Sequence, residues 1–180
     1  MECRGLLVEF GGLPGTGKST LARLLAADTK AVWLRIDEIE GAMRRNGLTP
    51  EQTGVAAYSV AHDLAASHLR RCLTVIADAV NPVAEARAGW RDLAAAVGAD
   101  HVVIETVCCD SAEHRRRVDG RVSDLSGWVH PTWAQVHQMM SGYQPRTGNR
   151  LVLDTTRPID ISYRDVTAYL ARREPAPKRD

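Results

Sequence analysis

Eight consecutive residues carry the strongest chemical signal in this chain. They are Gly12-Leu13-Pro14-Gly15-Thr16-Gly17-Lys18-Ser19, and they fit the phosphate-binding pattern G-x-x-x-x-G-K-[ST] at every position. Glycines let a loop backbone approach an anion closely, and the N–H groups of the loop and of the next helix then point at phosphate oxygens. Lys18 is expected to reach the β- and γ-phosphates, and Ser19 is expected to hold Mg²⁺. The motif, extended by Thr20, therefore predicts binding of a nucleoside triphosphate.

Two acidic residues stand at the ends of predicted strands, Asp37 after residues 32–36 and Asp78 at the end of residues 73–78. Ligands of parallel α/β sheets lie beyond the carboxyl ends of the strands, so both acids are expected beside the loop. Asp78 is predicted to join Ser19 in the Mg²⁺ site, with a turn or cap as the alternative. Asp37 is predicted to be a general base for an acceptor hydroxyl, with capping of the next helix as the alternative.

Arginines are concentrated in residues 115–121. Phosphoryl transfer spreads negative charge over the phosphate oxygens, which arginine side chains stabilise. Arg117 and Arg121 lie four positions apart, on one face of a helix, and are predicted to be the catalytic members of a lid. The alternative is a solvated basic helix whose arginines pair with the nearby acids Asp110, Glu113 and Asp119.

Further polar residues follow the acid-ended strands. Arg44, Asn81 and Arg87 are predicted to line the acceptor pocket with Asp37, although Asn81 is also a candidate helix N-cap. Arg157 follows the last predicted strand, where an adenine base usually rests in this topology. It is predicted to stack on the base, with a plain strand-to-helix turn as the alternative.

Short apolar runs alternate with helical patterns along the chain. Parallel strands joined by right-handed crossovers are the expected result, giving a three-layer α/β fold. We expect one domain over residues 1–173, with a lid at about 111–131, and a flexible tail over residues 174–180. The predicted strands are residues 6–10, 32–36, 73–78, 102–107 and 151–154.

Capping residues mark several helix starts. Thr49 and Thr132 are each followed three positions later by glutamine, which is the pattern of a capping box. Ser111 and Ser162 are predicted to cap two further helices.

Composition limits the classes of partner. The net charge of +1 gives no basic field for nucleic acid or an anionic membrane. No apolar run approaches the roughly 20 residues of a membrane span, and the N-terminus lacks a secretory signal pattern. The four cysteines show no metal-ligand spacing and are expected to be reduced thiols. These features favour a cytoplasmic protein that acts on small molecules, and they leave the oligomeric state open.

Taken together, the motifs resemble those of the small P-loop phosphotransferases of the zeta-toxin, phage polynucleotide kinase and chloramphenicol phosphotransferase kind, including AAA-33-type ATP-binding proteins. The resemblance extends to residue 155. It rests on Gly12–Thr20, Arg35-Ile36-Asp37-Glu38-Ile39, Val75–Pro82, Arg87, Trp90, Cys109-Asp110, His114–Arg121 and Trp133.

The resemblance implies ATP-dependent transfer of the γ-phosphate to a hydroxyl, on a five-stranded parallel sheet in the order 2-3-1-4-5. It implies phosphate and Mg²⁺ roles for Lys18 and Ser19, the base role for Asp37, and lid roles for Arg117 and Arg121.

One position departs from a branch of this group. Arg35 stands where the sulfate-nucleotide kinases have a second carboxylate, two residues before Asp37. This departure leaves the acceptor open.

Three functions fit these observations. The leading hypothesis is a kinase that uses ATP and Mg²⁺ to phosphorylate a hydroxyl of a small molecule. A polynucleotide 5′-hydroxyl kinase is the first alternative, and it would need a basic channel that the near-neutral charge disfavours. A nucleotide-dependent ATPase switch is the second, but the sequence has neither an N-K-x-D run nor the transporter signature L-S-G-G-Q.

Overall fold

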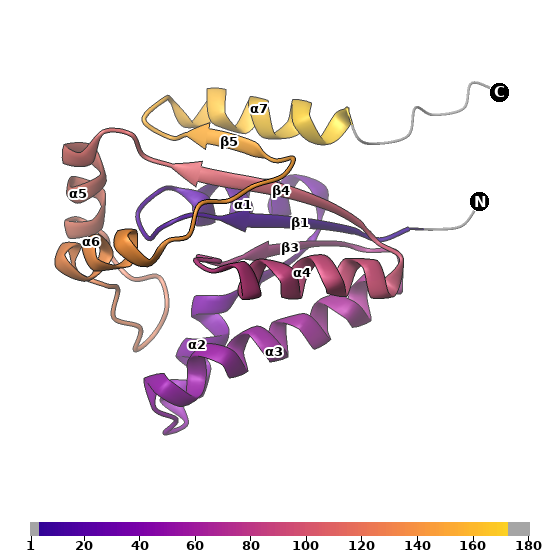
Figure 1. Cartoon of the computed structure of the whole chain (residues 1–180), viewed down its shortest axis with the longest axis horizontal. Helices are drawn as coiled ribbons and strands as arrows, with labels where there is room; N and C mark the ends of the chain where they lie inside the picture. Colours follow the sequence, from indigo (N-terminus) through magenta and orange to yellow (C-terminus); the bar gives the residue numbers. More distant parts are fainter. Residues whose placement is uncertain (1–3, 173–180) are drawn as a thin grey trace.

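The fold is built on one parallel sheet. The structure is a computed structural model that describes residues 4–172 of the chain. The five strands are β1 (Leu6–Gly11), β2 (Val32–Arg35), β3 (Thr74–Asp78), β4 (Asp100–Val107) and β5 (Leu151–Asp154). They pair in the order β2-β3-β1-β4-β5, with every neighbouring pair parallel, which confirms the predicted α/β topology (Figure 1).

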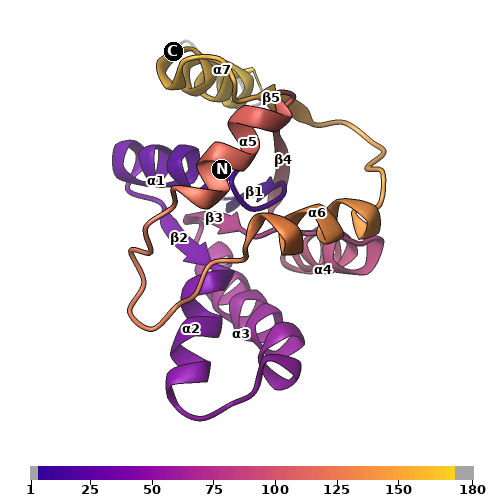
Figure 2. The same ribbon diagram turned by 90° about the vertical axis from the view of Figure 1, so that its left-hand side faces the viewer.

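Helices cover both faces of this sheet. They are α1 (Lys18–Thr29), α2 (Ile36–Arg45), α3 (Pro50–Leu69), α4 (Ala84–Val97), α5 (Ser111–Asp119), α6 (Trp133–Gly142) and α7 (Ile159–Ala171). In Figure 1, α1 and α7 lie on one side of the sheet, and α3 and α4 lie on the other. Both α5 and α6 stand beyond the carboxyl ends of the strands (Figure 2), where this class of fold places its ligands.

Alternation along the strands divides the core into two parts. Leu7 packs with residues of α3 and α4, whereas its neighbour Val8 packs with residues of α1 and α7. Successive side chains of a strand point to opposite faces, so β1 contributes to both clusters. Trp90 fills the first cluster and Phe10 the second, and both are fully buried. The rigid sheet that results fixes the positions of the loops at its carboxyl edge.

The helix starts agree with the predictions at two positions and differ at three. Thr49 and Thr132 precede α3 and α6, and the N–H of each donates to its glutamine partner at 2.8 Å, as the capping box requires. Asp110, not Ser111, caps α5: its Oδ1 accepts from the N–H of Ala112 at 2.9 Å and of Glu113 at 3.0 Å. The carboxylate accepts from both N–H groups, which makes it the stronger cap.

The other two differences also concern caps. Val83 precedes α4 without a side-chain cap, so the alternative role of Asn81 as the cap of this helix is wrong. Pro158 precedes α7, and Ser162 lies buried inside that helix, so the predicted cap at Ser162 is also wrong. Proline tolerates the first positions of a helix because it has no N–H to satisfy.

Cysteine chemistry differs from the expectation of four thiols. Cys72 is disulfide-bonded, whereas Cys108 and Cys109 are free. Disulfides are rare in the cytosol, so the cysteines no longer support the predicted compartment. In residues 4–172 no helix is long and apolar enough to span a membrane. The predicted tail, residues 174–180, lies outside the described residues.

Candidate functional site

The loop between β1 and α1 adopts a backbone that needs glycine at two positions. Gly12 has a φ of +138°, and a Cβ there would lie 2.4 Å from the carbonyl oxygen of Thr106. Gly15 has a φ of +84°, and its Cβ would lie 2.6 Å from Val118 Cγ2. Side chains at these positions would clash with β4 and α5, so the glycines let the loop pass between them.

Side chains donate hydrogen bonds to three backbone carbonyls of the phosphate loop. The Thr16 hydroxyl donates to the carbonyl of Leu13 at 2.7 Å, and His114 Nε2 donates to the carbonyl of Pro14 at 2.7 Å. The carbonyl of Thr16 accepts from the Thr155 hydroxyl at 2.9 Å. At the start of α1, the N–H groups of Lys18 and Ser19 make no backbone hydrogen bond with any described residue, so they remain available to an anion.

A cavity of about 630 Å³ opens over this loop. Its volume lies within the range of small-molecule and nucleotide sites. The cavity is lined by Gly15, Gly17, Lys18, Ser19, Thr20, Arg117, Arg121, Thr155, Thr156, Arg157, Pro158 and Ile159. Most of the residues that are predicted to bind the nucleotide therefore line this one cavity.

Asp78 ends β3 beside the start of α1. It is 2 % exposed, and neither of its carboxylate oxygens has a hydrogen-bond partner among the described residues. Burial raises the pKa of Asp78, while the neighbouring Lys18 and Ser19 oppose the rise. A buried carboxylate beside a serine hydroxyl is a pair of hard oxygen donors of the kind Mg²⁺ takes when phosphates supply its other ligands.

The Ser19 hydroxyl and the Asp78 carboxylate fit a metal ion only when a nucleotide supplies its other ligands. Among residues 4–172 no group of three or more His, Cys, Asp or Glu side chains is placed to hold a metal ion. Mg²⁺ commonly binds through one or two protein oxygens plus substrate phosphates, and Ser19 and Asp78 match that pattern.

Asp37 lies in the first turn of α2 and is half-buried. It makes no hydrogen bond with any described residue. Its charge acts on groups of this region: burial raises the pKa of Asp78 and of Tyr58, and the negative charge of Asp37 adds to both rises. Burial lowers the pKa of Arg121, and the charge of Asp37 opposes this. Asp37 is therefore within electrostatic reach of both the Asp78 carboxylate and a lid arginine.

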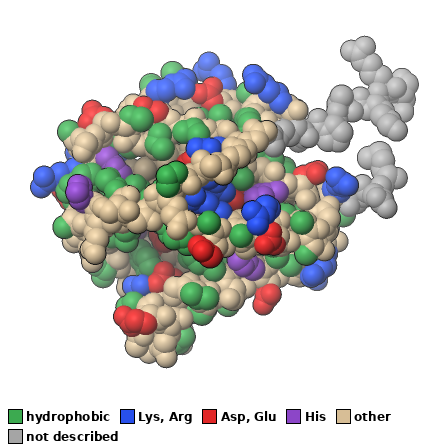
Figure 3. All heavy atoms as spheres, viewed as in Figure 1, with side chains coloured by type: hydrophobic (Ala, Val, Ile, Leu, Met, Phe, Trp, Pro, Cys, Tyr) green, Lys and Arg blue, Asp and Glu red, His purple; other side chains and the backbone are tan. Residues whose placement is uncertain are grey.

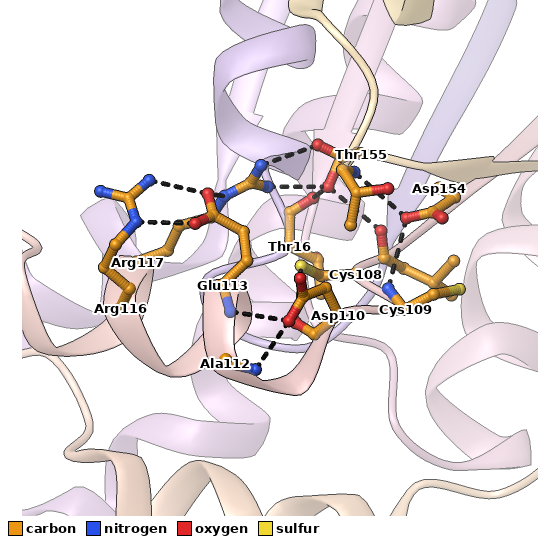
Figure 4. A network of polar contacts seen from close by, with 12 residues as sticks. Thr16, Cys108, Cys109, Asp110, Ala112, Glu113, Arg116, Arg117, Asp154 and Thr155 are labelled. Atoms are coloured by element: carbon orange, nitrogen blue, oxygen red, sulfur yellow. Dashed lines mark hydrogen bonds and ion pairs between the residues drawn. The ribbon is translucent and has the colours of Figure 1, made fainter.

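The two predicted lid arginines differ in how they are held. Arg117 donates to Glu113 Oε1 at 2.7 Å, and to the hydroxyl and carbonyl of Thr155 at 3.0 and 2.8 Å (Figure 4). Arg121 makes no hydrogen bond or ion pair with any described residue, although it lines the cavity. The neighbours Arg115 and Arg116 pair with acids of their own helix at the surface. Arg121 is thus the arginine whose guanidinium remains available to a ligand.

Comparison with known proteins agrees with this geometry. A family model described as an AAA domain, AAA_33, matches residues 7–146. The chain belongs to this AAA domain family. A search of curated protein sequences gives no match.

Solved structures share the fold of this AAA domain. A candidate kinase from Chloroflexus aurantiacus has 20 % identity and a TM-score of 0.77, covering 96 % of this chain and 97 % of the other. The Mycobacterium tuberculosis APS kinase in complex with AMPPNP and APS has 22 % identity and a TM-score of 0.68, covering 93 % and 98 %. A Sinorhizobium meliloti gluconokinase has 15 % identity and a TM-score of 0.66, covering 96 % and 94 %.

Two residues of this AAA domain that are predicted to bind the acceptor, Asn81 and Arg87, make their hydrogen bonds with other groups of the protein. Asn81 is fully buried; its Nδ2 donates to Glu9 Oε1 at 2.8 Å, and its Oδ1 accepts from Trp90 Nε1 at 3.2 Å. Arg87 donates to the backbone carbonyls of residues 81, 82, 144 and 145. Both side chains fix the loop after β3, and their role in binding the acceptor stays a prediction.

Two further predicted residues lie at the surface of the site. Arg44 pairs with Glu40, and its guanidinium lies 4.8 Å from the centre of the Trp128 ring. Arg157 lines the nucleotide cavity and pairs with Asp165 at 2.9 Å. Arg157 stays a predicted contact of the base.

Two residues that shape the site, Glu9 and Thr155, are not among those predicted from the sequence. Glu9 lies in the strand predicted over residues 6–10, yet it is fully buried and accepts hydrogen bonds from Asn81, from Arg146 at 2.7 Å and from His101 at 2.9 Å. A carboxylate inside an otherwise apolar strand is the signal that points to such a network, because a buried charge needs partners. Thr155 had no comparable signal, because its contact with the loop comes from the fold.

Proposed function

We propose that this AAA domain is an ATP-dependent phosphotransferase that moves the γ-phosphate to a hydroxyl of a small-molecule acceptor. The observation that carries the proposal is the unpartnered, buried carboxylate of Asp78 beside Lys18 and Ser19 at the phosphate loop. A carboxylate in that setting is poorly satisfied until a metal–phosphate group reaches it. Asp37 then supplies a second, chemically distinct carboxylate at the same edge of the sheet.

The chain's residues would divide the work as follows. The loop N–H groups and Lys18 bind the β- and γ-phosphates and stabilise the charge that develops on them. Ser19 and Asp78 would hold Mg²⁺, which supplies further positive charge to the phosphates when bound. Asp37 accepts the proton of the acceptor hydroxyl. The hydroxyl oxygen bonds to the γ-phosphorus as the bond from that phosphorus to the bridging oxygen breaks, and ADP leaves.

Arg121 is the lid arginine best placed to act during transfer. Its guanidinium has no competing partner among the described residues, whereas that of Arg117 is occupied by Glu113 and Thr155. Burial lowers the pKa of Arg121, yet an arginine keeps its charge at neutral pH. We therefore assign transition-state stabilisation to Arg121 and support of the nucleotide site to Arg117.

The distribution of charge favours a small acceptor over a nucleic acid. On the face shown in Figure 3, acidic and basic side chains are interspersed. Arg44 binds Glu40, and Arg45 donates to the carbonyl of Ser126, so both guanidinium groups already have protein partners. A polynucleotide would need such arginines for its phosphates, and its affinity would fall steeply with salt.

A binding and transfer experiment tests this function. AMPPNP titrated into the protein with Mg²⁺ should release heat in a calorimeter, and ATP turnover should stay slow until an alcohol acceptor is added. Lys18→Met should abolish both, while the matched change Lys30→Met at an exposed lysine should leave both intact. Fast ATP turnover that no alcohol alters would indicate a switch ATPase, and an absence of AMPPNP binding would contradict the proposal.

A further inference from the structure

A second cavity, of about 400 Å³, opens beside the end of α5. Arg121 lines this cavity as well as the first one, so the two cavities share this side chain. Its volume lies near the small end of the range for ligand pockets. Its wall includes Val118, Ser123, Trp128, His130 and Thr132. A molecule held there would lie next to the phosphate end of the nucleotide cavity.

The segment that forms most of the wall of this second cavity is bonded to β2 and α2, and Asp37 lies in α2. The segment between α5 and α6 runs past β2 and the start of α2 (Figure 2). Arg35 Nη1 binds Asp124 Oδ2 at 2.7 Å, and Arg45 Nη1 donates to the carbonyl of Ser126 at 2.8 Å. These contacts hold the segment on the Asp37 side of the site.

Two residues that line this cavity, Trp128 and His130, carry three polar atoms without partners. Trp128 Nε1 and both ring nitrogens of His130 are buried and make no hydrogen bond within residues 4–172. Buried polar atoms in proteins are rarely left unpaired, and those that are call for a physical explanation. A ligand with hydroxyl groups supplies both donors and acceptors, which is what an indole N–H and a neutral imidazole together require.

Burial and nearby positive charge favour the neutral imidazole of His130. Burial lowers the pKa of His130, and the positive charges of Arg121 and Arg35 lower it further, while Asp37 and Asp124 oppose them. A neutral imidazole presents one donor and one acceptor. It therefore suits a hydroxyl, which does both, better than a phosphate or carboxylate, which only accepts.

The remaining charges around the second cavity also disfavour an anionic acceptor. Arg35 forms an ion pair with Asp124, and Arg115 forms one with Asp119. Arg121 is left as the unpaired cation, and we have assigned it to the transferred phosphate. No further cation lines this cavity among the described residues.

We propose that the second cavity binds an uncharged alcohol of about the size of a sugar or a nucleoside, and that His130 positions its hydroxyl against Asp37. This inference rests on the proposed phosphotransferase function. His130 is a positioning residue here, because Asp37 takes the proton and Arg121 stabilises the transferred group.

Separation of acceptors by charge tests the substrate class. A metabolite extract is passed through an anion exchanger, and the flow-through and the retained fraction are each incubated with the protein and γ-³²P-labelled ATP. We expect label to appear in products of the flow-through. Label only in products of the retained fraction would overturn the inference and leave the kinase function standing. Label in neither would overturn both.

A pair of histidine variants tests the role of His130. His130→Asn should raise the concentration of flow-through needed for half-maximal transfer by about tenfold, the effect of one lost hydrogen bond, and leave the KM for ATP unchanged. His137→Asn, at an exposed histidine of α6, should change neither value. An unchanged acceptor requirement in His130→Asn, or an equal rise in the KM for ATP, would contradict the positioning role.

Discussion

Arg117 donates two hydrogen bonds to Thr155, from Nη1 to the hydroxyl at 3.0 Å and from Nη2 to the carbonyl oxygen at 2.8 Å. The same hydroxyl donates to the carbonyl of Thr16 at 2.9 Å. The lid helix α5, the start of the β5–α7 turn and the phosphate loop are thus joined through one threonine side chain. We infer that Thr155 keeps the loop in its binding conformation before any nucleotide arrives.

Removal of the Thr155 hydroxyl is expected to weaken nucleotide binding. Thr155→Val keeps the shape of the side chain but loses its donation to Thr16, so the loop must be ordered by the ligand itself. We expect the affinity for AMPPNP to fall by about tenfold in calorimetry. Thr167→Val, at an exposed threonine of α7, is the matched control and should bind normally. Equal affinities for the two variants would show that the hydrogen bond from Thr155 to Thr16 does not support the loop.

Arg121 should matter for transfer more than for binding. Arg121→Gln removes the unpartnered guanidinium, and we expect the rate of phosphate transfer to fall by about 10²- to 10³-fold, the usual effect of losing one group that stabilises transition-state charge. The affinity for AMPPNP should change little. Arg115→Gln, which alters a surface arginine paired with Asp119, should transfer at the normal rate. A larger loss in the Arg117→Gln variant than in Arg121→Gln would reverse the assignment of the two lid arginines.

Glu113 should make the lid helix sensitive to acid. Hydrogen bonds from Arg116 and Arg117 lower the pKa of Glu113 to about 2, from an ordinary value of 4.5. The stabilisation is complete above the ordinary value and is lost as the pH falls toward 2. Thermal melts should therefore show Glu113→Gln to be less stable than the natural protein at pH 6, with the gap closing as the pH falls. A gap that stays constant over this range would mean that the carboxylate charge contributes nothing.

Much of the fold was predictable because local patterns agree with the global topology. The phosphate motif fixes a strand, a loop and a helix by its own backbone needs, and the acid-ended strands place Asp37 and Asp78 at the carboxyl edge. The threonine–glutamine boxes at Thr49 and Thr132 depend on residues three apart, so they too are visible in the sequence.

The parts that escaped prediction depend on contacts between distant segments. Glu9 accepts a hydrogen bond from Arg146, which is distant in the sequence, and the role of Asn81 follows from its contact with Glu9. The difference between Arg117 and Arg121 arises because only one of them meets Thr155. No local pattern records such pairings, since they form only when the sheet and helices are assembled.

In the proposed reaction, Asp37 takes the proton of an acceptor hydroxyl beside a triphosphate bound to the loop. The most direct measurement compares Asp37→Asn with the natural protein in γ-³²P transfer to the flow-through fraction, with AMPPNP affinity measured in parallel. We expect transfer to fall by about 10²- to 10⁴-fold, the usual contribution of a general base, with the nucleotide affinity nearly unchanged. Transfer at the natural rate in Asp37→Asn would contradict the claim.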